Sequence, residues 1–106
     1  MDNIRAKTKL WDPAEHLETK EDMVAYIEAA LEDGDPSIIA SVLGDVARAE
    51  KMTEIAAKTG LSRTSLYRAL SSEGCPEFET VLKVLNALNL QLHVTQKVPQ
   101  QEELVA

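Results

Sequence analysis

Cysteine, aromatic residues and long apolar runs are all scarce in this 106-residue sequence. The single cysteine, Cys75, excludes an internal disulfide and is typical of a reducing compartment. No apolar run is long enough to cross a bilayer, and the N-terminal stretch lacks the apolar core of a signal peptide. We therefore expect a cytoplasmic protein with no membrane contact. With one Trp, two Tyr and one Phe, a core must be mostly aliphatic, as in a small helical bundle.

Basic residues are in the minority as well, and they are unevenly distributed. The 11 Lys and Arg against 18 Asp and Glu leave a net charge of −7, which is unusual for a protein that binds nucleic acid. Residues 11–46 carry ten acidic residues and one lysine, whereas residues 47–72 carry five basic residues and two acidic ones. The acidic half would discourage nonspecific binding to phosphates and would suit a basic protein partner.

No grouping of residues in the sequence is typical of an enzyme. There is no Ser/His/Asp arrangement, no phosphate-binding loop and no metal-ligand spacing. His16 has no second ligand at a helical spacing, and the acidic residues around Gly34 are explained by helix capping and solvation. We therefore predict no catalytic activity, no cofactor and no metal site.

Apolar residues recur at helical spacing in three segments, two before the chain's centre and one after it, and each predicts a helix. The first, residues 20–31, has Thr19 as its cap and stops at Gly34. The second begins at Asp35, the cap, followed by a proline at the first helical position, and it gives way to a polar link over residues 48–51. The third, residues 78–88, ends at an asparagine in place of the usual glycine. Its apolar positions are Phe78, Val81, Leu82, Leu85 and Leu88.

Residues 52–70 predict a helix-turn-helix, the element around which the chain is organised. Two short helices, residues 54–59 and 63–70, flank Gly60, which we expect at positive φ where the chain reverses. Thr53 and Ser62 are placed to cap these helices. The positions of the second helix that would enter the major groove of DNA carry no acidic side chain. These positions are Arg63, Thr64, Ser65 and Arg68. The alternative is an αα-corner that only packs, since such short patterns also arise by chance.

Residues 90–95 alternate between apolar and polar side chains, which is the period of a β-strand. One strand cannot satisfy its own backbone N–H and C=O groups, and the sequence predicts no second strand. We therefore predict a homodimer in which this strand pairs with the same strand of another copy, with the last helix helping to bury the pair. The predicted dimerisation residues are Leu85, Leu88, Leu90, Leu92 and Val94.

A set of segments between Trp11 and about Leu92 carries a resemblance to a known family: residues 11–17, Tyr26 with 29–31, 34–36, 47–49, 52–56, 60–67, 71–74 and 76–85. Their order and spacing resemble the Xre/Cro-like helix-turn-helix proteins, and within them the addiction-module antidote family. Two departures occur at helix ends. Lys51 follows Glu50 where such proteins often carry glycine, and Asn89 replaces the glycine common after the last helix.

The resemblance implies an all-α fold, a five-helix lambda-repressor-like helix-turn-helix domain with a short C-terminal β-strand. We expect an N-terminal extension over residues 1–18, this domain over residues 19–95 and a flexible tail over residues 96–106. The resemblance also implies an antitoxin of a type II toxin–antitoxin module. Such a protein silences a small toxin encoded beside it, typically a ribosome-dependent ribonuclease, and represses their shared operon as a dimer.

Matching positions imply how the protein would contact double-stranded operator DNA. Arg63, Thr64 and Arg68 would face bases, while Ser62 and the start of the first short helix, with Thr53, would contact phosphates. We expect the acidic N-terminal half to meet a basic toxin, because it lies far from the helix predicted to read DNA. The candidate toxin-binding residues are Trp11, Leu17, Tyr26, Glu28 and Glu32.

Three alternatives stay open at this point. The acidic residues could form only a solvated face. The chain could be a stand-alone Xre-type transcriptional regulator without a toxin partner. It could also be a protein-interaction module whose helix-turn-helix no longer binds DNA, which would suit the acidic net charge.

Overall fold

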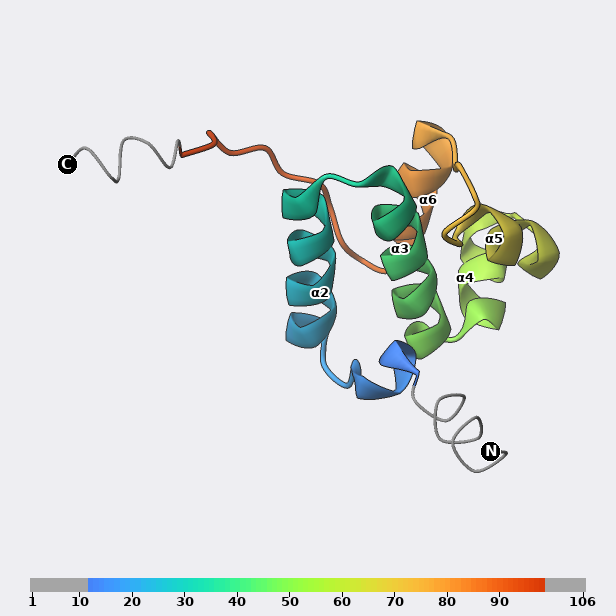
Figure 1. Cartoon of the computed structure of the whole chain (residues 1–106). Helices are drawn as coiled ribbons and strands as arrows, with labels where there is room; N and C mark the ends of the chain where they lie inside the picture. The colour runs from blue at the N-terminus through green and yellow to red at the C-terminus, as the bar shows by residue number, and fades with distance from the viewer. Residues whose placement is uncertain (1–11, 99–106) are drawn as a thin grey trace, which may run out of the picture.

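Five α-helices and one short 3-10 helix, with no β-strand, make up the part of the chain that the computed structural model describes, residues 12–98 (Figure 1). The elements are η1 (Pro13–His16), α2 (Lys20–Asp33), α3 (Pro36–Glu50), α4 (Met52–Thr59), α5 (Arg63–Ala69) and α6 (Phe78–Ala87). The all-α class predicted from the sequence is therefore confirmed.

Local capping interactions set both ends of α2 and the start of α3 as predicted. The Thr19 hydroxyl accepts a hydrogen bond from the Asp22 backbone N–H at 3.0 Å, and the Asp22 carboxylate accepts one from the Thr19 N–H at 3.2 Å. This reciprocal pair is a capping box. Gly34 ends α2 at φ 84°, and the Asp35 carboxylate accepts a hydrogen bond from the Ser37 N–H at 2.9 Å to begin α3. Both boundaries thus follow from residues adjacent in the sequence.

The central helix of the bundle is α3, which packs against η1, α2, α4 and α5, while α6 packs against α4 (Figure 1). An aliphatic core fills the space between these helices. Its fully buried side chains include Leu43, Val46, Ile55, Leu66, Val84 and Leu88. A Cβ atom on Gly44 of α3 would lie only 2.2 Å from the Leu70 carbonyl oxygen at the end of α5. Glycine at this position therefore lets α5 approach the centre of the bundle.

The connection between α3 and α4 differs from the prediction. The polar link expected over residues 48–51 is absent, because α3 continues to Glu50 and α4 begins at Met52. Lys51 alone makes the turn, at φ 97° and ψ 111°. The predicted cap, Thr53, is wrong, since it lies inside α4 and no side chain caps this helix. The helix begins earlier because Met52 is buried in the core, which commits the chain to α4 directly after α3.

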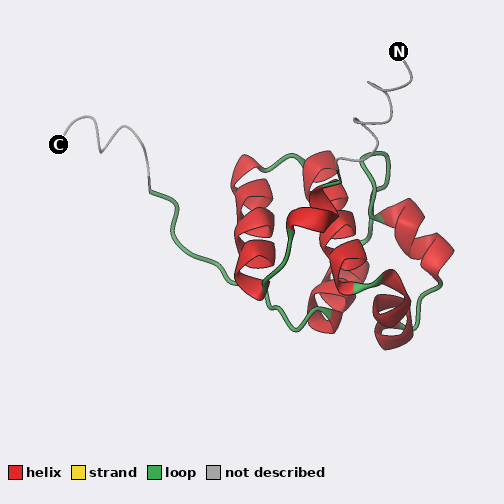
Figure 2. Cartoon of the chain, turned by 90° about the horizontal axis from the view of Figure 1, so that it is seen from below, coloured by secondary structure: helices red, strands yellow, loops and turns green. Residues whose placement is uncertain are grey.

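The strand predicted over residues 90–95 is likewise absent from the described chain, where this segment runs as a loop (Figure 2). A strand requires backbone groups from a neighbouring strand, and none of residues 12–98 offers them. The Leu90 N–H instead donates to the Leu85 carbonyl at 2.8 Å, and the Leu90 side chain packs against the core. Asn89 ends α6 at φ 63°, the conformation expected of a residue that replaces glycine there.

The apolar positions predicted for the last helix are not all buried. Leu85, Leu88 and Val84 of this region belong to the core, and Val81 packs against it in part. By contrast, Phe78 and Leu82 are exposed on the surface. The periodicity identified the helix correctly, although it did not distinguish the side chains that face the core from those that face away.

Candidate functional site

The exposed face of α5 carries the polar side chains predicted to bind DNA. Leu66 is completely buried and attaches this short helix to the core. The Ser62 hydroxyl caps it by accepting a hydrogen bond from the Ser65 N–H at 3.0 Å, as predicted. Arg63, Thr64 and Arg68 are exposed. The exposed face of α5 therefore carries two arginines and neighbouring hydroxyl groups, while Leu66 on the opposite face packs into the core.

The turn between α4 and α5 is held by short-range hydrogen bonds. Gly60 adopts φ 79°, which confirms the predicted positive φ, and its N–H donates to the Ala56 carbonyl at 2.9 Å. The Arg63 guanidinium donates to the Thr53 hydroxyl at 3.3 Å across the two helices. Thr53 and Arg63, ten residues apart in the sequence, are thereby brought together on the same exposed surface.

One further residue of this surface, Tyr67, was absent from the predicted set. Its side chain is 49% exposed, although an aromatic residue in a chain this poor in aromatics would be expected in the core. Tyr67 lies three residues after Thr64 and four after Arg63, so it shares their face of α5. That spacing was the available signal, since Leu66 is the residue that α5 directs inward.

A polar network on the other side of α3 joins three elements, and the sequence reasoning missed it. The Tyr26 hydroxyl of α2 donates to the Asp45 carboxylate at 2.6 Å, and the Arg48 guanidinium donates to Asp45 at 2.5 Å and to Asp12 at 2.6 Å. Asp45 is buried, so its charge requires these partners. The signal in the sequence was an aspartate in the middle of the apolar run of residues 42–47.

The network shifts the pKa values of its members. Burial, together with the hydrogen bond to Asp45, raises the pKa of Tyr26 to about 12. The hydrogen bond from Arg48 lowers the pKa of Asp12. The hydrogen bond to Asp12 also raises the pKa of Arg48. Arg48 is therefore balanced by two carboxylates, which removes it from the basic residues of the central segment that could face DNA.

The residues predicted to bind a toxin are distributed over different environments. Glu28 and Glu32 are exposed on α2, Leu17 packs in part against the core, and Tyr26 is half-buried with its hydroxyl bonded to Asp45. Trp11 lies outside the described residues. Glu28 and Glu32 are thus accessible to a partner, whereas the Tyr26 hydroxyl is already used by a hydrogen bond within its own chain.

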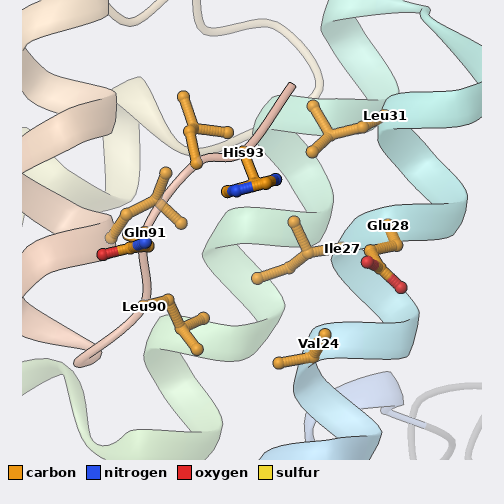
Figure 3. A pocket seen from close by; sticks show the side chains of 9 residues that line it. Val24, Ile27, Glu28, Leu31, Leu90, Gln91 and His93 are labelled. Carbon is orange, nitrogen blue, oxygen red and sulfur yellow. The ribbon is translucent and has the colours of Figure 1, made fainter. Parts of the chain in front are cut away.

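An apolar groove of about 120 Å³ runs beside Glu28, between α2 and the segment that follows α6 (Figure 3). Its floor includes Val24 and Ile27 of α2 and Leu90 from the opposite side. Leu31, 42% exposed, lines the groove. The only basic side chain of α2, Lys20, donates to the Leu88 carbonyl at 2.8 Å and lies 3.9 Å from Glu50. Glu28 is the charged residue of α2 that lines the groove, and it is acidic.

The predicted dimerisation residues also separate into two groups. Leu85 and Leu88 are buried in the core of their own chain. Leu90 is half-buried, whereas Leu92 and Val94 are exposed. Of the predicted dimerisation residues, Leu92 and Val94 are therefore fully accessible to a second copy, and Leu90 is accessible in part.

Residues 12–98 contain no cluster of three side chains suited to holding a metal ion. Over the same range, no helix has both the length and the apolar character needed to span a bilayer.

Two comparisons with known proteins match most of the chain. A family model described as "Probable addiction module antidote protein" matches residues 7–96. An uncharacterized protein of Haemophilus influenzae is 48% identical over 88 residues, which amount to 83% of this chain and 91% of that relative. No solved structure matches the chain.

Proposed function

Because the chain belongs to the addiction module antidote family, we propose that it is an antitoxin with two binding activities. It neutralises a small basic toxin encoded by an adjacent gene by binding it. It also represses its own operon, as a dimer, by sequence-specific binding to double-stranded DNA through α5.

The observation that supports DNA binding most strongly is the exposed face of α5. Arg63, Thr64, Ser65 and Arg68 can all hydrogen-bond to base edges or phosphates, and no acidic side chain lies within the helix. Pairing of Arg63 with Thr53 limits the rotamers of this arginine before DNA arrives, which lowers the entropy lost on binding. Tyr67 adds an aromatic ring that can contact a thymine methyl group or the sugar-phosphate backbone.

Alanine variants of the two arginines test this proposal. A bidentate contact between arginine and guanine contributes about 1–3 kcal/mol, so Arg63→Ala and Arg68→Ala should each weaken binding about ten- to a hundredfold. Fluorescence anisotropy with DNA from upstream of the chain's own gene provides the measurement. Lys97→Ala is the matched control, because it removes one exposed positive charge outside α4 and α5. If all three variants lose affinity equally, net charge and not α5 governs binding.

The toxin surface that we propose is the groove beside α2 together with Glu28 and Glu32. Apolar anchors in a groove contribute most of the affinity at protein interfaces, and Leu31 and the groove floor provide them. The acidic residues would accelerate association with a basic partner and exclude other partners. Lys20 donates to the Leu88 carbonyl and lies 3.9 Å from Glu50, whose carboxylate offsets part of the one positive charge of α2.

Capture of the adjacent gene's product by the tagged chain tests the toxin surface. Leu31→Ser and Glu28→Lys should each reduce the affinity about tenfold, and the effect of Glu28→Lys should shrink at high salt. Ile38→Ser is the control, since Ile38 on α3 is 43% exposed, matching Leu31 at 42%. DNA binding by all three variants should be unchanged. If Ile38→Ser reduces the affinity for this product as much as the other two variants do, the toxin-binding surface lies elsewhere.

A stand-alone transcriptional regulator is the alternative, and the α5 surface supports it equally well. The two differ in whether a gene for a short basic protein lies beside this one and whether its product co-purifies with the chain.

A further inference from the structure

Residues 91–98 form a segment whose backbone is unpaired and accessible along its whole length. All eight residues are exposed, and they include no helix or turn (Figure 2). The Leu90 N–H donates to the Leu85 carbonyl, but no backbone group after Leu90 makes a backbone hydrogen bond within residues 12–98. A row of free N–H and C=O groups is the template that an edge strand offers to another strand.

The apolar groove beside α2 runs along the start of this segment. Leu90 and Val24 lie at one end of the groove, and His93 and Leu31 lie at the other (Figure 3). From Val24 to Leu31 an α-helix rises about 10 Å, and from Leu90 to His93 an extended chain spans about the same length. The groove and the unpaired backbone are therefore side by side over the same length.

We propose that an extended strand of a basic protein partner occupies this site, by pairing with residues 91–95 and directing every second side chain into the groove. The groove takes apolar side chains, because Val24, Ile27 and Leu31 line it. Alternate residues of a strand project to the same face, so a partner with apolar residues at every second position suits both the groove and the backbone. The proposal rests on the toxin binding proposed above and specifies which part of the toxin is recognised.

The charged residues near the groove indicate the sign of the partner. Glu28 lines the groove, and Glu32 is exposed one turn later on α2. Lys97 lies four positions beyond His93, the last residue of the segment that lines the groove. A lysine or arginine on the partner strand would therefore meet an acidic border, which favours association with a basic protein.

A partner strand accounts for this site better than the same segment of a second copy. Two such segments paired alone would make a two-stranded ribbon, which is marginally stable in water. The side chains expected to bury that ribbon, Leu85 and Leu88, are buried in the core of their own chain. A strand at the edge of a partner's sheet brings the rest of that sheet with it, so it does not need this burial.

Amide hydrogen exchange tests the pairing, measured residue by residue by NMR on the full chain with and without the product of the adjacent gene. In the free chain the amides of residues 91–95 should exchange without protection. In the complex, alternate amides should be protected at least tenfold, because successive N–H groups of a strand point to opposite edges.

The outcomes of this measurement separate the proposal from the function on which it rests. If the product binds but none of these amides gains protection, the strand pairing is overturned while the antitoxin function stands. Protection that is present in the free chain and lost on dilution would assign the segment to a second copy and would also overturn the proposal. If the product does not bind at all, the proposed toxin binding itself fails.

Proline substitutions test the same pairing through the affinity for this product. Proline removes one N–H, so it disrupts pairing only where that N–H faces the partner. His93→Pro and Val94→Pro are at successive positions, so one should weaken capture at least tenfold and the other should leave it within about twofold. The proline effects are measured relative to His93→Ala and Val94→Ala, which remove the same side chains and keep the N–H. Two prolines that weaken capture equally, or that both leave it unchanged, would contradict strand pairing.

Discussion

Replacing Gly44 by alanine should destabilise the protein, although an alanine in the middle of a helix is ordinarily favourable. Gly44 lies in α3, where α5 approaches most closely. The added Cβ would lie 2.2 Å from the Leu70 carbonyl oxygen and 3.3 Å from the Leu70 carbonyl carbon. The end of α5 would have to move by about 0.8 Å or more, because Cβ atoms in real proteins essentially never lie closer than 3.0 Å to such an atom.

Two opposing effects decide the magnitude. Helix propensity alone would stabilise Gly44→Ala by up to about 1 kcal/mol. Overpacking costs about 1–3 kcal/mol, and the upper end applies because the obstacle is backbone and because Leu66 and Leu70 of the same segment are both buried. The net change in the free energy of unfolding is therefore a loss of about 2 kcal/mol. In a domain of this size that lowers the melting temperature by about 8–16 °C.

Thermal and urea unfolding followed by circular dichroism provide the measurement. Ser41→Ala is the control, since it makes a helix-favouring change on the same helix where the side chain is only half-buried. It should change the free energy of unfolding by less than about 0.5 kcal/mol. If Gly44→Ala melts at the wild-type temperature or above it, propensity outweighs packing and the close approach of α3 and α5 is not a constraint.

Three other predictions concern strain and titration. Lys51 adopts φ 97°, a conformation that strains a side chain, so Lys51→Gly should raise the free energy of unfolding by about 1 kcal/mol in urea denaturation; a decrease would contradict this. Burial raises the pKa of Tyr26 to about 12. In Tyr67→Phe, Tyr26 is the one tyrosine left, so the tyrosine absorbance of this variant should titrate near pH 12. A midpoint near the ordinary pKa of about 10 would refute the prediction. The corresponding stabilisation is present below about pH 10 and is lost as the pH rises through 12. Arg48 lowers the pKa of Asp12, so the wild type should have a higher free energy of unfolding than Asp12→Asn. This difference should be complete above about pH 4, the ordinary pKa of an aspartate, and should diminish as the pH falls through the lowered pKa of Asp12. A difference that does not change with pH would exclude the ion pair.

The helix ends were predictable where the controlling residues are close in sequence. Thr19, Asp35 and Ser62 cap their helices, and Gly34 and Gly60 take positive φ, as expected. Each of these interactions spans four residues or fewer, so the residue types themselves determine the conformation. The exposed polar face of α5 followed from the same kind of local periodicity.

The end of α3 and the start of α4 were not predictable in this way. A glycine would have marked the turn, but Lys51 adopts positive φ instead. Burial of Met52 compensates for that conformation, and burial is a property of the assembled core. Local capping rules therefore placed the helix two residues too late and assigned Thr53 a role it does not have.

Contacts between distant segments decided the remaining features. Arg48 meets Asp12, and Tyr26 meets Asp45, only because η1 and α2 pack against α3, and no short-range pattern joins residues 36 and 19 positions apart. Likewise, the apolar period of residues 78–88 determined that a helix forms, but the packing of α6 against α4 decided that Leu85 faces inward and Phe78 outward. Periodicity is a property of one segment, whereas the direction of a face depends on the helix against which it packs.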